Sequence, residues 1–267
     1  MRPPARCSNS GCALSMMNLN ATAIAAGVRL ITHDVLDSTN GHALALARGG
    51  ERGPLWITAQ RQTAGRGRRG RSWVSQPGNL YATLLLASPV RPQCWPQLSL
   101  VAGLAVYDAL IEIAPDLKQR LAIKWPNDLL LDGAKFAGIL IEGEGGNEAV
   151  AIGMGVNCAS HPAKTEYPAT DLASAGMQIA PEMLFPPLSL KMIGRLAQWN
   201  GGDGFPTVRS DWIARAAGVG EQIRVRLPNR ELLGRFAALD DNGSLVLCVA
   251  DGSVITVTAG DVVMVRT

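Results

Sequence analysis

The pattern of apolar residues changes near residue 218, and this change limits the possible folds more than any other feature of the sequence. Between residues 28 and 217, apolar runs of helical length alternate with shorter β-favouring runs, which indicates a mixed α/β domain. From residue 218 to residue 267 the apolar runs are short and are separated by turn signals such as Asp251-Gly252. We therefore expect an α/β protein of the α+β type, with a mixed sheet packed against helices and a small C-terminal β-barrel.

Capping and turn residues locate individual elements within this pattern. Ser38 or Thr39 is a good N-cap for a helix over 41–47, and Asp132-Gly133 predicts the tight turn of a hairpin. Gly218 is expected to end the last helix. The other expected helices cover 98–113, 188–199 and 208–217, and the expected strands cover 55–59, 80–87, 121–131, 136–141, 150–156, 223–227, 234–239, 245–249 and 254–257.

Residues 1–27 are rich in Ser, Asn and Ala without a clear period, so we expect a poorly ordered N-terminal tail. The apolar run from Cys12 to Met17 is too short for a secretory signal, and Met16 or Met17 is an alternative start. No run reaches the roughly 18 uninterrupted apolar residues that a membrane helix needs. We expect no membrane association.

The five cysteines are odd in number and irregularly spaced, which argues against a disulfide framework. The three histidines form no metal-ligand cluster with them. Reduced structural thiols of this kind are typical of the cytoplasm, where we expect the protein to work. The cysteines are Cys7, Cys12, Cys94, Cys158 and Cys248, and the histidines are His33, His42 and His161.

Arginine is concentrated in one glycine-rich segment between two expected strands. The chain has 20 arginines and 5 lysines, and Arg61, Arg66, Arg68, Arg69 and Arg71 fall within eleven residues that contain no acid. The formal charge of the chain is +3 and would be −2 without these five residues. Guanidinium groups on a flexible backbone suit phosphate and carboxylate, although a solvated loop or a nucleic-acid contact gives the same pattern. Its position between apolar strands favours a small anionic ligand.

A second polar cluster follows a strand at Lys124-Trp125-Pro126-Asn127-Asp128. Asn127 and Asp128 offer oxygen ligands for Mg²⁺ or a ribose, while the same residues are also ordinary turn formers. Lys135 projects from the start of the return strand, where a solvated lysine is the simpler interpretation. Gly138 in that strand, and Gly153 and Gly155 in a neighbouring one, indicate a close approach to the backbone.

The order of these motifs resembles the biotin–protein ligase family. Ser38-Thr39-Asn40 is followed by GRGRRGRSW ending at Trp73, KWPNDLLL from Lys124, KFAGIL from Lys135 and IGMGVN ending at Asn157. The resemblance extends over residues 30–267 and implies a class II synthetase-like catalytic domain over 28–217, with the barrel over 218–267. It also implies ATP-dependent ligation of biotin to a lysine of a biotin carboxyl carrier protein, through biotinyl-5′-AMP.

The resemblance implies a role for each motif residue. Lys135 and Arg68 are the expected catalytic residues, because they neutralise the two reacting anions. Asp128 is the candidate Mg²⁺ ligand. The expected biotin-binding residues are Ser38, Thr39, Asn40, Gln62, Arg66, Gly67, Arg68, Lys135, Gly138, Gly153 and Gly155. The expected nucleotide-binding residues are Arg68, Arg71, Trp73, Lys124, Asn127, Asp128 and Asn157, with a core position as the alternative for Trp73.

Two rival functions remain open at this point. A lipoate or octanoate ligase or transferase has the same overall fold, but those relatives use a different glycine-rich motif. A nucleic-acid-binding module that uses the arginine loop is the alternative from another class. The family also includes repressors with an N-terminal helix-turn-helix, for which the residues before Ser38 show no paired helices, so we expect no DNA partner. The sequence leaves a monomer and a homodimer equally open.

Overall fold

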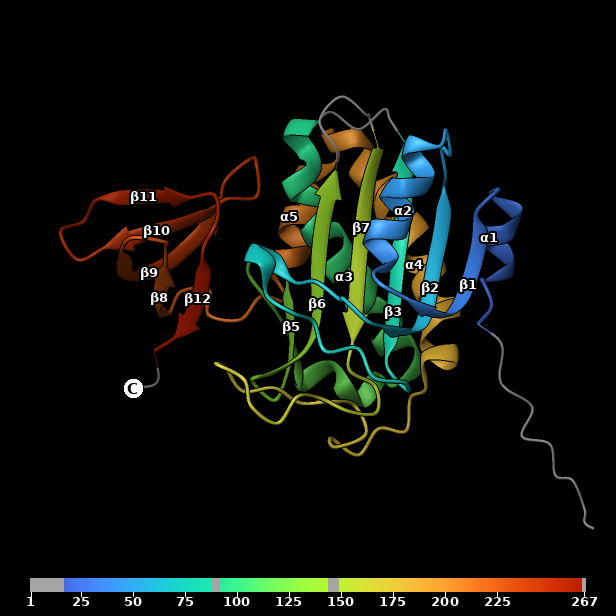
Figure 1. The fold of residues 1–267 in the computed structure, drawn as a ribbon. Helices are drawn as coiled ribbons and strands as arrows, with labels where there is room; N and C mark the ends of the chain where they lie inside the picture. Colours follow the sequence, from blue (N-terminus) through green and yellow to red (C-terminus); the bar gives the residue numbers. More distant parts are fainter. Residues whose placement is uncertain (1–16, 88–91, 144–148, 266–267) are drawn as a thin grey trace, which may run out of the picture.

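The computed structural model describes residues 17–87, 92–143 and 149–265 (Figure 1). Its larger part is a seven-stranded sheet in the order β1-β2-β3-β7-β6-β5-β4. Strands β1 and β2 are parallel and all other neighbours are antiparallel, so the expected mixed sheet is confirmed. The strands are β1 (Arg29–Leu36), β2 (Leu55–Gln62), β3 (Leu80–Ala87), β4 (Leu121–Lys124), β5 (Asp128–Leu131), β6 (Ala134–Gly143) and β7 (Ala149–Val156).

Helices cover both faces of this sheet. Helix α2 (Thr39–Arg48) lies on one face, where Ala43 and Ala47 pack against residues of β2, β3 and β7. Helices α3 (Trp95–Ile113) and α4 (Pro181–Trp199) lie on the other face, and α5 (Phe205–Ile213) packs against both (Figure 1). Ser38 caps α2 by accepting a hydrogen bond from the amide of Gly41, as its sequence position predicts.

Helix α3 is largely buried in the core. Twelve of its residues are buried, and Val101, Ala105 and Ala109 have no exposed surface. Among the described residues it is the one helix with the length and hydropathy of a membrane-crossing segment, yet it is two-thirds buried inside this fold. Its apolar composition therefore reflects contacts with β6, β7, α4 and α5.

The C-terminal residues form a second, five-stranded antiparallel sheet in the order β11-β10-β9-β8-β12. This sheet is the small C-terminal β domain expected from the sequence, and among the described residues its end strands, β11 and β12, are not paired with each other. The sequence prediction also lacked the last strand, Asp261–Met264. The strands are β8 (Gln222–Arg226), β9 (Glu231–Leu239), β10 (Leu245–Val249), β11 (Val254–Val257) and β12 (Asp261–Met264).

The expected bounds of several elements need correction, including the last helix, which is Phe205–Ile213 and does not end at Gly218. Residues 1–16 of the expected tail lie outside the described part, but helix α1 (Ala21–Ala25) is ordered, with Asn20 as its cap and Ala23 fully buried. The segment 121–131 is two strands, β4 and β5, because a turn centred on Pro126 folds it back on itself. Helix α4 starts before Leu188, with Pro181 as its first residue and Pro186 and Pro187 inside it. Short 3₁₀ turns occur at Arg68–Gly70, Pro92–Cys94, Pro115–Gln119 and Asn200–Gly202.

Candidate active site

One face of the large sheet forms the floor of a cavity below α2. In an antiparallel sheet every second residue of a strand lies on the same face. The register pairs Gly138 with Gly155 and Leu140 with Gly153, and the next such pair is Glu142 with Ala151. Leu140 and all three glycines line the cavity. Because the three glycines have no side chains, they leave space above this part of β6 and β7.

A β-bulge turns Lys135 toward the same cavity. Lys135 and Gly138 are three positions apart, and in a regular strand they would lie on opposite faces. The pairing with β5 skips Phe136, so that Leu129 opposes Ala137 and Leu130 opposes Lys135. The Lys135 ammonium consequently lies on the cavity side, and Nζ is 3.3 Å from the position of a Cβ built on Gly138.

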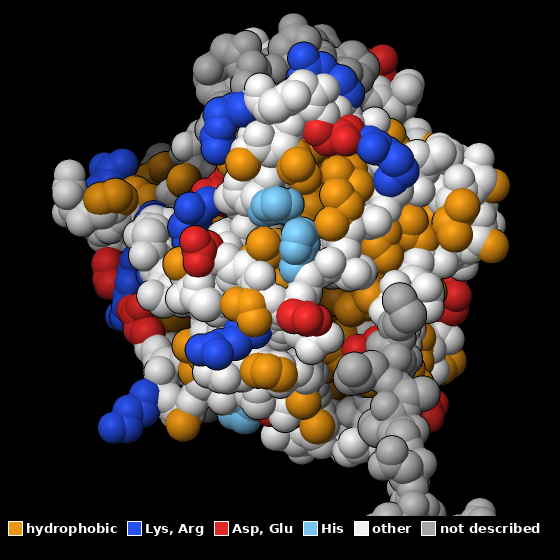
Figure 2. All heavy atoms as spheres, turned by 45° about the vertical axis from the view of Figure 1, so that its right-hand side comes forward, with side chains coloured by type: hydrophobic (Ala, Val, Ile, Leu, Met, Phe, Trp, Pro, Cys, Tyr) orange, Lys and Arg blue, Asp and Glu red, His pale blue; other side chains and the backbone are white. Residues whose placement is uncertain are grey.

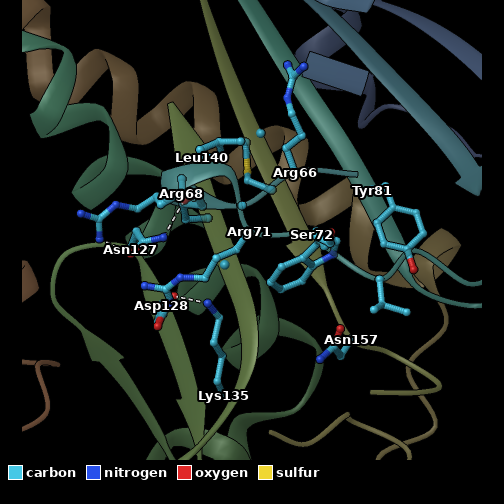
Figure 3. A pocket seen from close by; sticks show the side chains of 18 of the residues that line it. Arg66, Arg68, Arg71, Ser72, Tyr81, Asn127, Asp128, Lys135, Leu140 and Asn157 are labelled. Carbon is cyan, nitrogen blue, oxygen red and sulfur yellow. Dashed lines mark hydrogen bonds and ion pairs between the residues drawn. The ribbon is translucent and has the colours of Figure 1, made fainter. Parts of the chain in front are cut away.

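Three charged side chains meet at this end of the cavity. Lys135 Nζ is 2.5 Å from Asp128 Oδ1, and Lys124 Nζ is 3.4 Å from Asp128 Oδ2 (Figure 3). Burial raises the pKa of the Asp128 carboxyl, but the two ammonium groups outweigh burial and hold this pKa below its ordinary value. Asp128 is therefore ionised at neutral pH, and the cluster of these three residues carries a net positive charge.

The opposite end of the cavity is lined by neutral hydrogen-bonding groups. The Gln62 side-chain oxygen accepts hydrogen bonds from the amide and the hydroxyl of Thr39, at 2.8 and 3.1 Å. The Gln62 amide nitrogen donates to the Ser75 hydroxyl at 3.0 Å. Ser38 and Thr39 are buried at the start of α2. This arrangement provides fixed donors and acceptors without charge, which suits an uncharged polar ligand group.

Asn40 joins α2 to the floor. Its amide nitrogen donates to the Leu140 carbonyl and to the Glu142 carboxylate, and its oxygen accepts from the Thr83 hydroxyl at 2.7 Å. A Cβ on Gly153 would lie 2.3 Å from that oxygen. Gly153 is therefore required by a protein side chain that packs on it, rather than by direct contact with a ligand.

The arginine loop crosses above the floor, and acidic or carbonyl partners on both sides hold it. Arg66 pairs with Glu142 at 3.1 Å. Arg68 Nη1 donates to Asn127 Oδ1 at 3.0 Å and to the Gly260 carbonyl at 3.3 Å (Figure 3). Arg69 and Arg71 both pair with Asp261 of the second sheet. These pairs direct the guanidinium groups toward the cavity and its rim.

Trp73, at the end of this loop, packs on the floor. A Cβ on Gly155 would lie 2.6 Å from its ring, and one on Gly138 would lie 3.0 Å from it. Lys135 Nζ is 5.4 Å from the centre of the ring, a cation–π distance. Of the two sequence interpretations, the structure favours the one in which Trp73 lines the cavity, and its indole nitrogen has no hydrogen-bond partner among the described residues.

The structure brings together all but one of the predicted site residues. Those that line the cavity are Ser38, Thr39, Asn40, Gln62, Arg66, Gly67, Arg68, Arg71, Trp73, Asn127, Asp128, Lys135, Gly138, Gly153, Gly155 and Asn157. Lys124 is the exception, because its ammonium lies behind Asp128 and donates to the Val262 carbonyl at 3.4 Å. In the structure Lys124 pairs with Asp128 from outside the cavity lining, and its contact with a nucleotide stays a prediction.

Sequence reasoning missed several residues of this region, among them Tyr81, Glu142 and Asp261. Tyr81 and Asp261 line the cavity, and Glu142 binds two residues that do. Tyr81 and Glu142 lie in apolar strands, where the alternation of faces was the available signal. Asp261 is 190 positions from Arg71, and no local pattern links such distant residues.

Two observations, one on a single face of the molecule and one on the arginine loop, favour a small-ligand site over a nucleic-acid interface. Figure 2 shows the face to the right in Figure 1, where Lys and Arg side chains are scattered among acidic, histidine and apolar ones. No continuous basic patch is visible on this face. In addition, Arg66, Arg69 and Arg71 of the arginine loop are paired with carboxylates.

Comparisons with known proteins agree with this site. Residues 34–158 match the Biotin/lipoate A/B protein ligase family, and residues 218–265 match the Biotin protein ligase C terminal domain. A biotin–[acetyl-CoA-carboxylase] ligase of Paracoccus denitrificans is 45% identical over 79% of this chain and 90% of its own length. One of Mycobacterium tuberculosis is 36% identical over 86% of both chains.

A solved structure shows the same architecture. The biotin protein ligase from Aquifex aeolicus in complex with biotin and ATP superposes with a TM-score of 0.77 and 26% identity, over 90% of this chain and 99% of the other. Fold, site and sequence together define a ligase of the biotin/lipoate superfamily. More narrowly, the chain belongs to the biotin protein ligase family.

Proposed function

We propose that this protein is an ATP-dependent ligase that attaches biotin to a lysine of a biotin carboxyl carrier protein. The observation that carries this proposal is the division of the cavity into a neutral polar end and a cationic end. Gln62 and Thr39 at one end suit the uncharged ureido ring of biotin. Lys135 and Arg68 at the other end suit its carboxylate and the α-phosphate of ATP. The relatives described above are biotin ligases, which favours biotin over lipoate or octanoate.

In the first step, a biotin carboxylate oxygen attacks the α-phosphorus of ATP, the bond to the β-phosphate breaks, and pyrophosphate leaves. Two anions must approach each other, and their repulsion is large in a site with little water. We assign Lys135 and Arg68 to neutralising this charge, while Asn127 orients Arg68 through the 3.0 Å hydrogen bond. Catalysis then consists of positioning and electrostatic stabilisation, without a covalent intermediate on the enzyme.

In the second step, the neutral amine of the carrier lysine attacks the carbonyl carbon of biotinyl-5′-AMP. The carbon–oxygen bond to the phosphate breaks, AMP leaves, and the amine proton passes to solvent. The arginine loop covers the mixed anhydride until the carrier arrives, which limits its hydrolysis. The partner is therefore the biotin-accepting domain of a carboxylase, and ATP and biotin are substrates.

Mg²⁺ fits this site as a companion of ATP rather than as a resident ion. The described residues contain no group of three or more potential metal ligands. The Asp128 carboxylate forms ion pairs with the ammonium groups of Lys135 and Lys124. Mg²⁺ commonly takes one carboxylate and several phosphate oxygens, and it would then offset phosphate charge. We propose that Asp128 is that carboxylate.

The cysteines support our proposal that the protein works in the cytoplasm. Within the described ranges, Cys94, Cys158 and Cys248 are free. Burial raises the pKa of the Cys158 thiol to about 12, so it stays protonated at neutral pH and is chemically inert. Cys7 and Cys12 lie outside the described residues.

The test of the function is release of pyrophosphate from ATP with each of three acids. Biotin should trigger release in the presence of Mg²⁺, whereas lipoate and octanoate should not. A carrier domain should then become biotinylated at one lysine, detected by mass spectrometry. If biotin triggers no release while lipoate or octanoate does, the assigned substrate is wrong.

A further inference from the structure

Glu142 lies next to the cavity and has no role in the reaction described above. It is on β6, on the same face as Gly138 and Leu140, and its side chain is 27% exposed. One carboxylate oxygen, Oε2, accepts a hydrogen bond from Asn40 at 2.9 Å and pairs with Arg66 at 3.1 Å. A single atom therefore connects two residues that are 26 positions apart in the chain.

These two partners belong to different parts of the site. Asn40 is only 4% exposed and is fixed against the floor by the Leu140 carbonyl and the Thr83 hydroxyl. Arg66 belongs to the exposed arginine loop, and its side chain is 46% exposed. Glu142 thus joins a rigid element to a segment whose side chains are largely in solvent.

The direction of Arg66 supports an anchoring role. In Figure 3, the Arg66 side chain points away from Asp128 and Lys135, whereas Arg68 and Arg71 extend toward that end of the cavity. Arg66 is consequently not the arginine that faces the reacting phosphate. Its ion pair with Glu142 holds one side of the loop, and the pairs of Arg69 and Arg71 with Asp261 hold the other.

We propose that Glu142 is a positioning residue that ties the arginine loop to the floor of the site through Arg66, and so sets how long biotinyl-5′-AMP stays bound. This inference rests on the proposed function. Loss of the Glu142 charge frees the loop at this side without removing any group that touches the reacting atoms. The rate of adenylate dissociation should change, while the binding of biotin to the floor should not.

Two substitutions separate the contacts of Glu142. Glu142→Gln keeps an oxygen for Asn40 but loses the charge for Arg66, and Glu142→Ala loses both. Glu51→Gln is a matched control, because Glu51 also pairs with an arginine, is 22% exposed and is remote from the cavity. Each full-length variant is loaded with labelled biotin and ATP, and adenylate dissociation is followed after a chase, alongside the KM for biotin and the Tm.

We expect Glu142→Gln to release the adenylate about two- to fivefold faster, the size of a partly exposed ion pair, with an unchanged KM for biotin. Glu142→Ala should also raise this KM, because Asn40 loses a partner. Arg66→Gln should accelerate adenylate dissociation at least as much as Glu142→Gln does, and the double variant should be no faster than Arg66→Gln alone. Glu51→Gln should leave dissociation at the wild-type rate.

Two results overturn the inference while leaving the function intact. One is a wild-type dissociation rate in Glu142→Gln, and the other is an additive effect in the double variant. If Glu142→Gln lowers the Tm and weakens the binding of biotin and of ATP alike, the role of Glu142 is purely structural, and this result also overturns the inference. If the wild-type protein itself releases no pyrophosphate with biotin, the proposed function fails instead.

Discussion

Lys135 shows how one residue acquires its function from its surroundings. In the sequence it is a lysine beside a turn, a position that is usually solvated. In the structure it faces a cavity, pairs with Asp128 and lies over the ring of Trp73. The remaining positive charge of the Lys135–Asp128–Lys124 cluster is available to a bound anion.

Lys135→Ala should lower the rate of adenylate formation about 10²- to 10³-fold, the range observed when one electrostatic donor is removed from an active site. Single-turnover formation of biotinyl-5′-AMP measures this rate. Lys191→Ala is the matched control, because Lys191 is also paired with a carboxylate and is similarly exposed, at 33% against 29%. Normal adenylate formation in Lys135→Ala would refute its catalytic role.

Asp128 should titrate below the ordinary carboxyl value of 3.8, because Lys135 and Lys124 stabilise its charged form. A pKa that is lowered in the folded state stabilises the protein above pH 3.8, and this contribution is lost as the pH falls through the folded value. NMR of labelled aspartate carboxyls measures the pKa directly. In Lys135→Gln the pKa should rise, and an unchanged value would show that the ion pair is absent in solution.

At the scale of elements, the site depends on how closely α2 approaches β7. Gly153 allows the Asn40 side chain to lie against the strand, and Thr83 on β3 then holds its oxygen. Helix α2 itself packs on this face through Ala43, Leu44 and Ala47. Small residues on the helix and the strand therefore position the neutral end of the cavity.

Gly153→Ala should raise the KM for biotin more than tenfold, with less effect on the KM for ATP. The added methyl group overlaps the Asn40 amide, and such overpacking also costs about 1–3 kcal/mol of stability. Steady-state kinetics and urea unfolding measure both effects. Gly194→Ala is the control, because nothing lies within 4 Å of its added Cβ, so it should leave both KM values unchanged. Equal effects on biotin and ATP would contradict the assignment.

Elements with strong local signals were predicted well from the sequence. The strand over 80–87 has the expected bounds, and the Asp132-Gly133 turn is present, with positive φ at both residues. Errors occurred where local signals conflict with tertiary contacts. Pro186 and Pro187 concealed the start of α4, and the turn at Pro126 divided one expected strand into two. The convergence of the motif residues was predictable through the family resemblance, whereas Glu142 required the register of the sheet.

At the scale of the whole molecule, the arginine loop links the two sheets. Arg69 and Arg71 pair with Asp261, and Arg68 donates to the carbonyl of Gly260, so residues at the start of β12 hold the loop from the second sheet. The C-terminal sheet therefore contributes to the wall of the cavity. This contact explains why a site built from the larger domain includes a residue from the smaller one.

Asp261→Asn should make the loop more accessible to trypsin, which cuts after arginine. Without ligands, cleavage between Arg66 and Arg71 should be faster than in the wild-type protein, while the loss of stability stays at or below about 1 kcal/mol. Mass spectrometry of timed digests locates the cut. Asp241→Asn is the control, because it breaks the ion pair with Arg209 and leaves the loop untouched. Equal cleavage rates in Asp261→Asn and the wild-type protein would show that the loop is held elsewhere.

The bulge at Phe136 also has a consequence for engineering. The bulge shifts the alternation of faces in β6 by one position. Lys135 therefore lies on the same face as Gly138, although three positions separate the two residues. Deleting Phe136 would remove the bulge and leave Lys135 two positions from Gly138, so the lysine would still face the cavity, whereas regular alternation with every residue kept would turn it toward the helices. The direction of Lys135 is thus set by one irregular residue, and a redesign that keeps the length of β6 but regularises its pairing with β5 would turn this lysine away from the cavity.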